Sequence, residues 1–198
     1  MFEILKTLVK TTGLSKRDFT VLTEAATTLE VWGPEVADIF YDSILAHQPT
    51  ANLIQPEEKE RHREQLLNWY CQLFTDDFSK TFWRAQWLVG LVHVKRNIPI
   101  HTVIAGMSRI QLYFLAKCLH EFEPDYARIV YGAFKRLTDV VTGLFVEGFF
   151  ETYFEAFRKT SGIKQKVIHN MVQMELNKLI EHDRQQLQQL FKKEQTGN

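Results

Sequence analysis

The chain lacks an excess of charge, is poor in cysteine and has no long hydrophobic run. Its 198 residues include 24 basic and 24 acidic side chains, so no net field attracts nucleic acid or an anionic membrane. The two cysteines, Cys71 and Cys118, are too few for a disulfide scaffold and suit a reducing compartment. No apolar run is long enough to span a membrane, and the N-terminus lacks a signal-peptide pattern. We therefore expect a cytoplasmic protein that binds neither nucleic acid nor membrane.

Strand patterns are lacking too, because no segment alternates apolar and polar residues over a useful length. Prolines and glycines are sparse and fall between segments of helical periodicity. Ser15 with Asp18 predicts a capping box, and Asp76 or Asp77 is expected to cap the helix that contains His93. The predicted fold class is all-α. Helices are expected over residues 2–10, 15–29, 34–47, 56–74, a segment around His93, 99–120 and 124–158.

His93 is the first candidate for a functional role. It lies in the largely apolar helical segment Trp87–Lys95, which offers few groups to hydrogen-bond a buried imidazole. A neutral imidazole is a good ligand for iron, and haem proteins commonly hold the metal through one histidine. Taken alone, the same pattern also suits a histidine at the edge of a hydrophobic core.

A second candidate group lies on the segment 56–74. His62, Gln65, Leu66 and Trp69 are spaced i, i+3, i+4 and i+7, so they share one face of a helix. A histidine and a glutamine on an apolar stripe each carry a desolvation cost, which favours a polar task for them. The alternative is that His62 is solvated among the charged residues around it.

Four stretches of the chain form one pattern when taken in order. They are Leu14–Asp18, Ile39–Leu45 with its Phe40-Tyr41 pair, Trp69–Phe74, and Val89–His93 followed by Ile98-Pro99. In this order and spacing they resemble the globin domain of globin-coupled sensors, the haem-based oxygen-sensing modules of bacterial and archaeal signalling proteins. The resemblance implies a globin fold of the sensor-globin type with an extra N-terminal helix. It assigns residues 1–158 to the globin domain and 159–198 to a C-terminal helical extension or linker.

The resemblance also implies a cofactor, haem b, whose iron is bound by His93. The chain has no Cys-x-x-Cys-His motif, so the haem is expected to be non-covalent. By the same resemblance, Tyr41 hydrogen-bonds a diatomic ligand: oxygen, carbon monoxide or nitric oxide. The other expected pocket residues are Phe40, His62, Gln65, Leu66, Trp69, Val89 and Val92.

Two positions depart from the family pattern, in which the places of His62 and Gln65 are commonly apolar or small. Either side chain could hydrogen-bond the gas alongside Tyr41. Alternatively, His62 could itself bind the iron and give a six-coordinate resting state. His101 is a less favoured alternative iron ligand, because it stands at the start of a helix just after Pro99.

The function implied is a gas sensor that binds oxygen reversibly at ferrous iron and is not an enzyme. A haem-free, globin-like signalling module is the main alternative. A haem enzyme is less favoured, since the sequence shows no flavin motif or reductase segment. The family implies a homodimer through the last two globin helices. An apolar stripe suits that dimer or, equally, a core: Phe134, Leu137, Val141, Leu144, Phe145 and Phe149.

The last segment, from Lys164 to Lys193, has the pattern of one amphipathic helix without a regular heptad, because Asp183 and Gln186 interrupt its apolar positions. In sensor relatives such a helix joins the globin to a signalling output. The sequence leaves open whether this chain acts alone, continues into an output domain or binds a separate signalling partner.

Overall fold

A computed structural model describes residues 1–75 and 78–196 of the chain. Every regular element in these residues is a helix, which confirms the predicted fold class. The elements are α1 (Phe2–Thr12), α2 (Lys16–Glu24), α3 (Ala26–Val31), α4 (Gly33–Leu45), α5 (Gln48–Ala51), the 3-10 helix η1 (Pro56–Glu58), α6 (Lys59–Gln72), α7 (Lys80–Lys95), α8 (Ile100–Glu121), α9 (Pro124–Ser161) and α10 (Gln165–Thr196).

Helix starts follow the prolines, as the sequence predicts. Pro34 lies in the first turn of α4, Pro99 is the N-cap of α8, and Pro124 opens α9. Proline suits these places because the first backbone N–H groups of a helix have no partner within the helix. The capping box of Ser15 and Asp18 is present at the start of α2. The start of α7 is capped by Ser79, while Asp76 and Asp77 lie outside the described residues.

The structure differs from the predicted helices at α5, which was not expected, at residues 56–74, where the 3-10 helix η1 precedes α6, and most clearly at residues 15–29. The segment 15–29 was expected to be a single helix, but α2 ends at Glu24 and α3 begins at Ala26. Between them, Ala25 has φ −87° and ψ −4°, and its N–H bonds to the carbonyls of Thr23 and Val21. Alanine is the strongest helix former and gives no sequence signal for such a break. Its side chain is buried, so tertiary packing overrides local propensity here.

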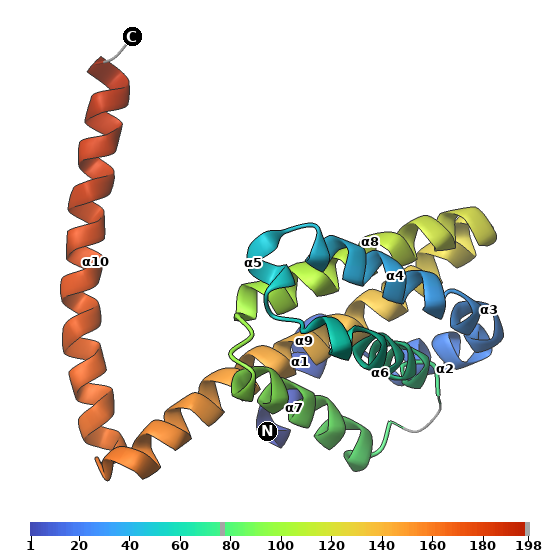
Figure 1. Cartoon of the computed structure of the whole chain (residues 1–198), viewed down its shortest axis with the longest axis horizontal. Helices are drawn as coiled ribbons and strands as arrows, with labels where there is room; N and C mark the ends of the chain where they lie inside the picture. Colours follow the sequence, from blue (N-terminus) through green and yellow to red (C-terminus); the bar gives the residue numbers. More distant parts are fainter. Residues whose placement is uncertain (76–77, 197–198) are drawn as a thin grey trace. The chain divides into compact units, whose positions relative to one another are not determined.

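The structure divides into two compact units, Met1–Thr152 and Tyr153–Asn198. Unit 1 holds α1 to α8 and most of α9. Unit 2 holds the end of α9 and the long helix α10 (Figure 1). Within unit 1, α4 packs against both α6 and α8. The domain boundary expected after residue 158 stays a prediction.

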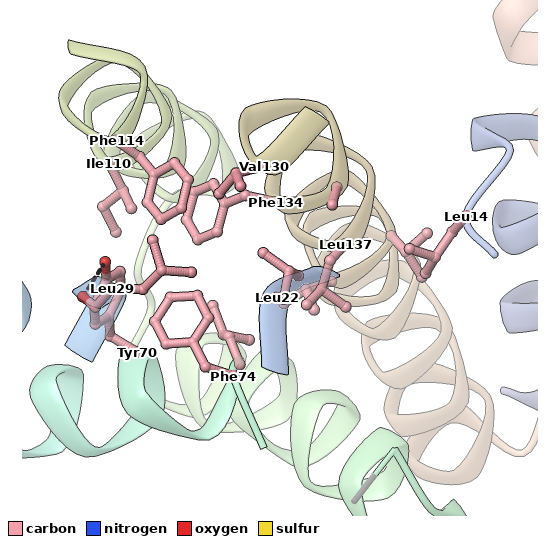
Figure 2. Close-up of a cluster of buried hydrophobic side chains, with 14 of the residues drawn as sticks. Leu14, Leu22, Leu29, Tyr70, Phe74, Ile110, Phe114, Val130, Phe134 and Leu137 are labelled. Carbon is pink, nitrogen blue, oxygen red and sulfur yellow. Dashed lines mark hydrogen bonds between the residues drawn. The ribbon is translucent and has the colours of Figure 1, made fainter. Parts of the chain in front are cut away.

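An aromatic cluster fills the centre of one half of unit 1 (Figure 2). The rings of Phe114 and Phe134 stack at 3.6 Å between centroids with an interplanar angle of 5°. Phe74 stacks on both rings at 6.2–6.3 Å. Tyr70 is fully buried beside them, and its hydroxyl donates to the Leu29 carbonyl over 3.0 Å. Every group in this cluster is therefore either apolar or hydrogen-bonded, as a close-packed core requires.

Most of the apolar stripe on α9 belongs to the hydrophobic core. Phe134, Leu137, Val141 and Leu144 have no exposed surface, and Phe145 is 6% exposed, whereas Phe149 is only partly buried. For the five buried side chains, the structure gives the core role of the two that the sequence left open. A dimer through α8 and α9 would use other residues of these helices.

A buried carboxylate ties the N-terminal part of unit 1 to α9. Asp18 accepts hydrogen bonds from the Ser15 backbone N–H (2.8 Å) and from the Ser15 hydroxyl (2.9 Å), and it forms an ion pair with Arg136. Burial raises the pKa of Asp18, but the hydrogen bonds from Arg136 and Ser15 outweigh it and hold the pKa below its usual value. The carboxylate is therefore ionised at neutral pH and stabilises the fold.

Candidate functional site

Unit 1 contains a cavity of about 510 Å³, within the range of roughly 300–1,000 Å³ that is typical of small-molecule and cofactor sites. Side chains from α4, α6, α7, α8 and α9 line it, together with residues between α5 and η1 and between α7 and α8. All nine residues predicted from the sequence are among them: Phe40, Tyr41, His62, Gln65, Leu66, Trp69, Val89, Val92 and His93. The structure thus gathers into one cavity residues that are up to 53 positions apart in the sequence.

His93 lies in the last turns of α7 and is partly buried. Its Nδ1–H donates to the Val89 carbonyl over 2.7 Å. Burial lowers the pKa of His93 more than this hydrogen bond raises it, so the ring is neutral at pH 7. Because a carbonyl can only accept, the proton is on Nδ1 and Nε2 keeps a free lone pair. Histidine ligands of metals are commonly oriented through such a bond to a backbone carbonyl.

The ring of His93 is also fixed by its packing against α9. It stacks on Phe145, with 6.0 Å between ring centroids and an interplanar angle of 24°. Three residues before His93, Gly90 lets the two helices come close. A Cβ at Gly90 would lie 3.1 Å from the Phe145 Cα and 3.3 Å from its carbonyl oxygen. A larger residue at position 90 would push α7 and its histidine away from α9.

Tyr41 lies on α4, next to Phe40 and buried in the cavity wall. The two rings meet edge to face at 5.2 Å, and Phe40 is seated against Gly106 of α8, where a Cβ would approach the ring to 2.5 Å. Burial raises the pKa of Tyr41 to about 12 despite the opposing charge of Arg96. The hydroxyl therefore stays protonated and can donate. Within the described part of the chain no group accepts this donor.

His62 has a partner in the cavity wall. Its Nε2 lies 2.6 Å from Nη1 of Arg96. Since a guanidinium only donates, Nε2 of His62 must accept, and the ring is neutral. Burial and the charge of Arg96 both lower the pKa of His62. The hypothesis that His62 binds iron through Nε2 would require this hydrogen bond to break, because the same lone pair would serve both.

The remaining predicted residues of α6 make up the same wall. Leu66 and Trp69 are partly buried, whereas Gln65 is exposed overall although it lines the cavity. The Trp69 indole N–H donates to Oε1 of Gln86 over 2.8 Å. Gln86 is 1% exposed and lies on α7. This bond connects α6 to α7 beside the cavity.

Sequence reasoning missed two polar residues of the cavity wall. Arg96 follows α7 as its C-cap, and Thr102 lies in the first turn of α8. Thr102 is buried, and its hydroxyl has no hydrogen-bond partner within the described ranges. Position gave a usable signal for Arg96, because it is one helical turn beyond His93. Nothing in the sequence distinguishes Thr102 from an ordinary helical threonine.

The other side chains considered as metal ligands do not line the cavity. His101 is exposed and does not line the cavity. Cys71 and Cys118 are both free thiols. In residues 1–75 and 78–196 no group of three or more histidine, cysteine, aspartate or glutamate side chains is placed to hold a metal ion. In the same ranges, no helix is both long enough and apolar enough to cross a bilayer.

Comparison with family models identifies the family of this chain. The model of the family described as Protoglobin matches residues 3–155, which is most of the chain. The chain belongs to the Protoglobin family. The matched range covers every residue that lines the cavity.

A solved structure supports the same fold. The globin domain of the Geobacter sulfurreducens globin-coupled sensor superposes with a TM-score of 0.61 at 17% sequence identity, covering 73% of this chain and 96% of that domain. At this identity the likeness concerns the fold, which is of the globin type that the sequence predicted. No curated protein matches the chain at a significant level.

Proposed function

We propose that this protein binds haem b non-covalently in the cavity of unit 1, with His93 as the protein ligand to iron, and that it binds oxygen or another diatomic gas reversibly as a sensor. Bound haem would supply the iron site at which a gas binds and is released. The observation that carries the proposal is the placement of His93 in the wall of a cofactor-sized cavity, where its Nδ1 is held by the Val89 carbonyl and its Nε2 is left for a ligand.

The chemistry of the cavity supports this choice of cofactor. Most of the lining side chains are aliphatic or aromatic, which suits the faces of a porphyrin. The hydroxyl of Thr102 is buried in the wall and lacks a partner among the described residues. A buried hydroxyl without a partner costs about 1–3 kcal/mol, so a polar ligand in the cavity would relieve that cost. Tyr41, protonated at neutral pH, would donate to the gas.

The test of this proposal is the visible spectrum of purified protein supplied with haem. Wild type is expected to retain haem with a Soret band, whereas His93→Ala is expected to stay helical and lose haem on gel filtration. His101→Ala is the matched control, since His101 is exposed and outside the cavity. An unaltered spectrum in His93→Ala would sink the assignment of the ligand. A wild type that takes up no haem would leave the haem-free signalling module as the better account.

We also propose a homodimer and a signalling partner or output, on the strength of the family alone. Since most of the apolar stripe of α9 is core, the dimer would use exposed apolar side chains of the same two helices, such as Ile104, Leu112 and Leu119 on α8 and Ile129 on α9. Sedimentation equilibrium of the purified protein decides between monomer and dimer. The proposed function is ligand binding for signalling rather than catalysis, in the cytoplasm.

A further inference from the structure

Arg96 is the one charged side chain that lines the cavity, as far as the structure describes the chain. We propose that its guanidinium binds a carboxylate of the cavity's occupant, which for haem b is a propionate. This inference rests on the proposed function, because it assigns a role within the same cavity. It adds a residue that fixes the orientation of the cofactor and selects for ligands with an acidic edge.

Arg96 lies at the edge of the cavity, where the carboxylate of a bound ligand could keep contact with water. Arg96 is the C-cap of α7, and its backbone N–H bonds to the Val92 carbonyl. The side chain is 32% exposed, so the guanidinium stands where the cavity wall meets solvent. An ionised carboxylate is costly to bury fully but can remain partly hydrated at such an edge. A ligand with apolar faces and an acidic edge would satisfy both parts of the cavity.

The guanidinium also has donors to spare. Arginine carries five N–H groups in a planar fork. One on Nη2 donates to Glu58, and one on Nη1 donates to Nε2 of His62. Three N–H groups remain for a further acceptor. The two protein partners hold the fork in a fixed orientation, which lowers the entropic cost of binding a carboxylate.

The charges around Arg96 leave an unbalanced positive charge. Glu58 pairs with Arg96 and also with Arg61, so two guanidinium groups share one carboxylate. His62 adds no charge, because it accepts from Arg96 and is neutral. The nearby pair of Arg63 and Asp38 is balanced within itself. A carboxylate from a ligand would complete the charge balance of the group Arg61, Glu58 and Arg96.

A purely structural role would give a different result in one experiment. In that role, Arg96 would only tie the end of α7 to Glu58 and to α6, and its loss would loosen the cavity for any occupant. In the proposed role, its loss matters only for an occupant with free carboxylates. Haem and its dimethyl ester separate these cases, because they differ only at the propionates, which are ionised in haem and are uncharged methyl esters in the derivative.

The experiment measures the rate at which loaded protein transfers its porphyrin to excess haem-free myoglobin, followed by absorbance. Arg96→Ala is expected to lose haem about tenfold faster than wild type or more. For the dimethyl ester, wild type and variant are expected to agree within about twofold. Arg96→Lys, which keeps the charge but not the fork, is expected to fall between them for haem.

Arg61→Ala is the matched control, because Arg61 shares Glu58 with Arg96 but is exposed and lies outside the cavity. It removes one positive charge from the group but leaves the fork of Arg96 in the cavity wall, so it should speed haem release by less than Arg96→Ala does. Equal acceleration of haem and ester in Arg96→Ala would overturn the proposal in favour of a structural tie. Wild-type rates in Arg96→Ala would overturn it while leaving the proposed function standing. A wild type that takes up neither porphyrin would overturn both.

Discussion

Unit 1 has a close-packed half and a half that surrounds a cavity, and the same helices build both. Tyr70 on α6 and Phe74, just after it, enter the aromatic cluster, whereas Leu66 and Trp69 on α6 line the cavity. On α9, Phe134 stacks within the cluster and Phe145 backs the ring of His93. The two halves are built by the same helices, so they differ in which side chains of those helices pack against one another.

Two buried tyrosines summarise this contrast in chemical terms. Tyr70, in the packed half, donates to a backbone carbonyl at 3.0 Å. Tyr41, in the cavity wall, has no acceptor among the residues that the structure describes, although burial raises the pKa of both hydroxyls. A core satisfies its polar groups internally, while a binding site leaves some of them for its ligand.

The largest expected effect comes from opening the packed half. Phe134→Ala removes a fully buried ring that stacks on Phe114 and should lower the free energy of unfolding by about 3–5 kcal/mol. Met107→Ala, on the cavity wall, should cost about 2 kcal/mol in the ligand-free protein, because one side of that side chain already faces a void. Urea denaturation of both variants measures the difference. Equal costs would mean that the cavity wall is packed as tightly as the core.

A smaller effect, with a pH signature, is expected at Asp18. Because the folded-state pKa is lowered, the carboxylate stabilises the fold above its unfolded pKa of about 3.8, and the contribution is lost as the pH falls through the folded value. Asp18→Asn should therefore cost about 1–3 kcal/mol at about pH 6 and progressively less below about pH 4. Denaturation curves at several pH values test this. A cost that is constant down to about pH 2 would assign the effect to packing instead of charge.

The smallest effects separate the two tyrosines. Tyr70→Phe removes the hydroxyl donor to the Leu29 carbonyl, which keeps the Trp32 N–H, and should destabilise the fold by about 1 kcal/mol. Tyr41→Phe breaks no protein hydrogen bond and should change stability by less than about 0.5 kcal/mol.

In haem-loaded protein, Tyr41→Phe should instead speed oxygen release about tenfold, and carbon monoxide release less, by stopped-flow measurement. Equal changes for both gases would mean that Tyr41 acts through its size.

Much of the fold could be predicted from the sequence, because the features that start and stop its helices are local. Prolines 34, 99 and 124 begin helices whatever the tertiary structure, since a missing N–H costs nothing there. The nine cavity residues were found by resemblance and by helical spacing, which places His62, Leu66 and Trp69 on one face. The sequence does not predict the break between α2 and α3 at Ala25, because alanine favours a helix and the break depends on the packing around its buried side chain.

The unpredicted parts of the site depend on distances between helices. The bond from Arg96 to His62 joins residues 34 positions apart, and no spacing rule connects them. The same holds for the bond from Trp69 to Gln86 and for the close approach of Gly90 to Phe145. Each of these contacts follows from how α6, α7 and α9 pack, and local periodicity carries no information about that packing.

Because the protein has a cavity, its free energy of unfolding depends on the ligands in solution as well as on its sequence. A molecule that enters the folded cavity and does not bind the unfolded chain adds RT ln(1 + [L]/Kd) to the free energy of unfolding, about 2.7 kcal/mol at a concentration one hundred times Kd. In the cavity wall the buried hydroxyl of Thr102 has no partner among the described residues, and most of the other lining side chains are apolar. Cofactor supply would thus set how often the chain opens to proteases, so that the abundance of the protein would follow the abundance of its ligand.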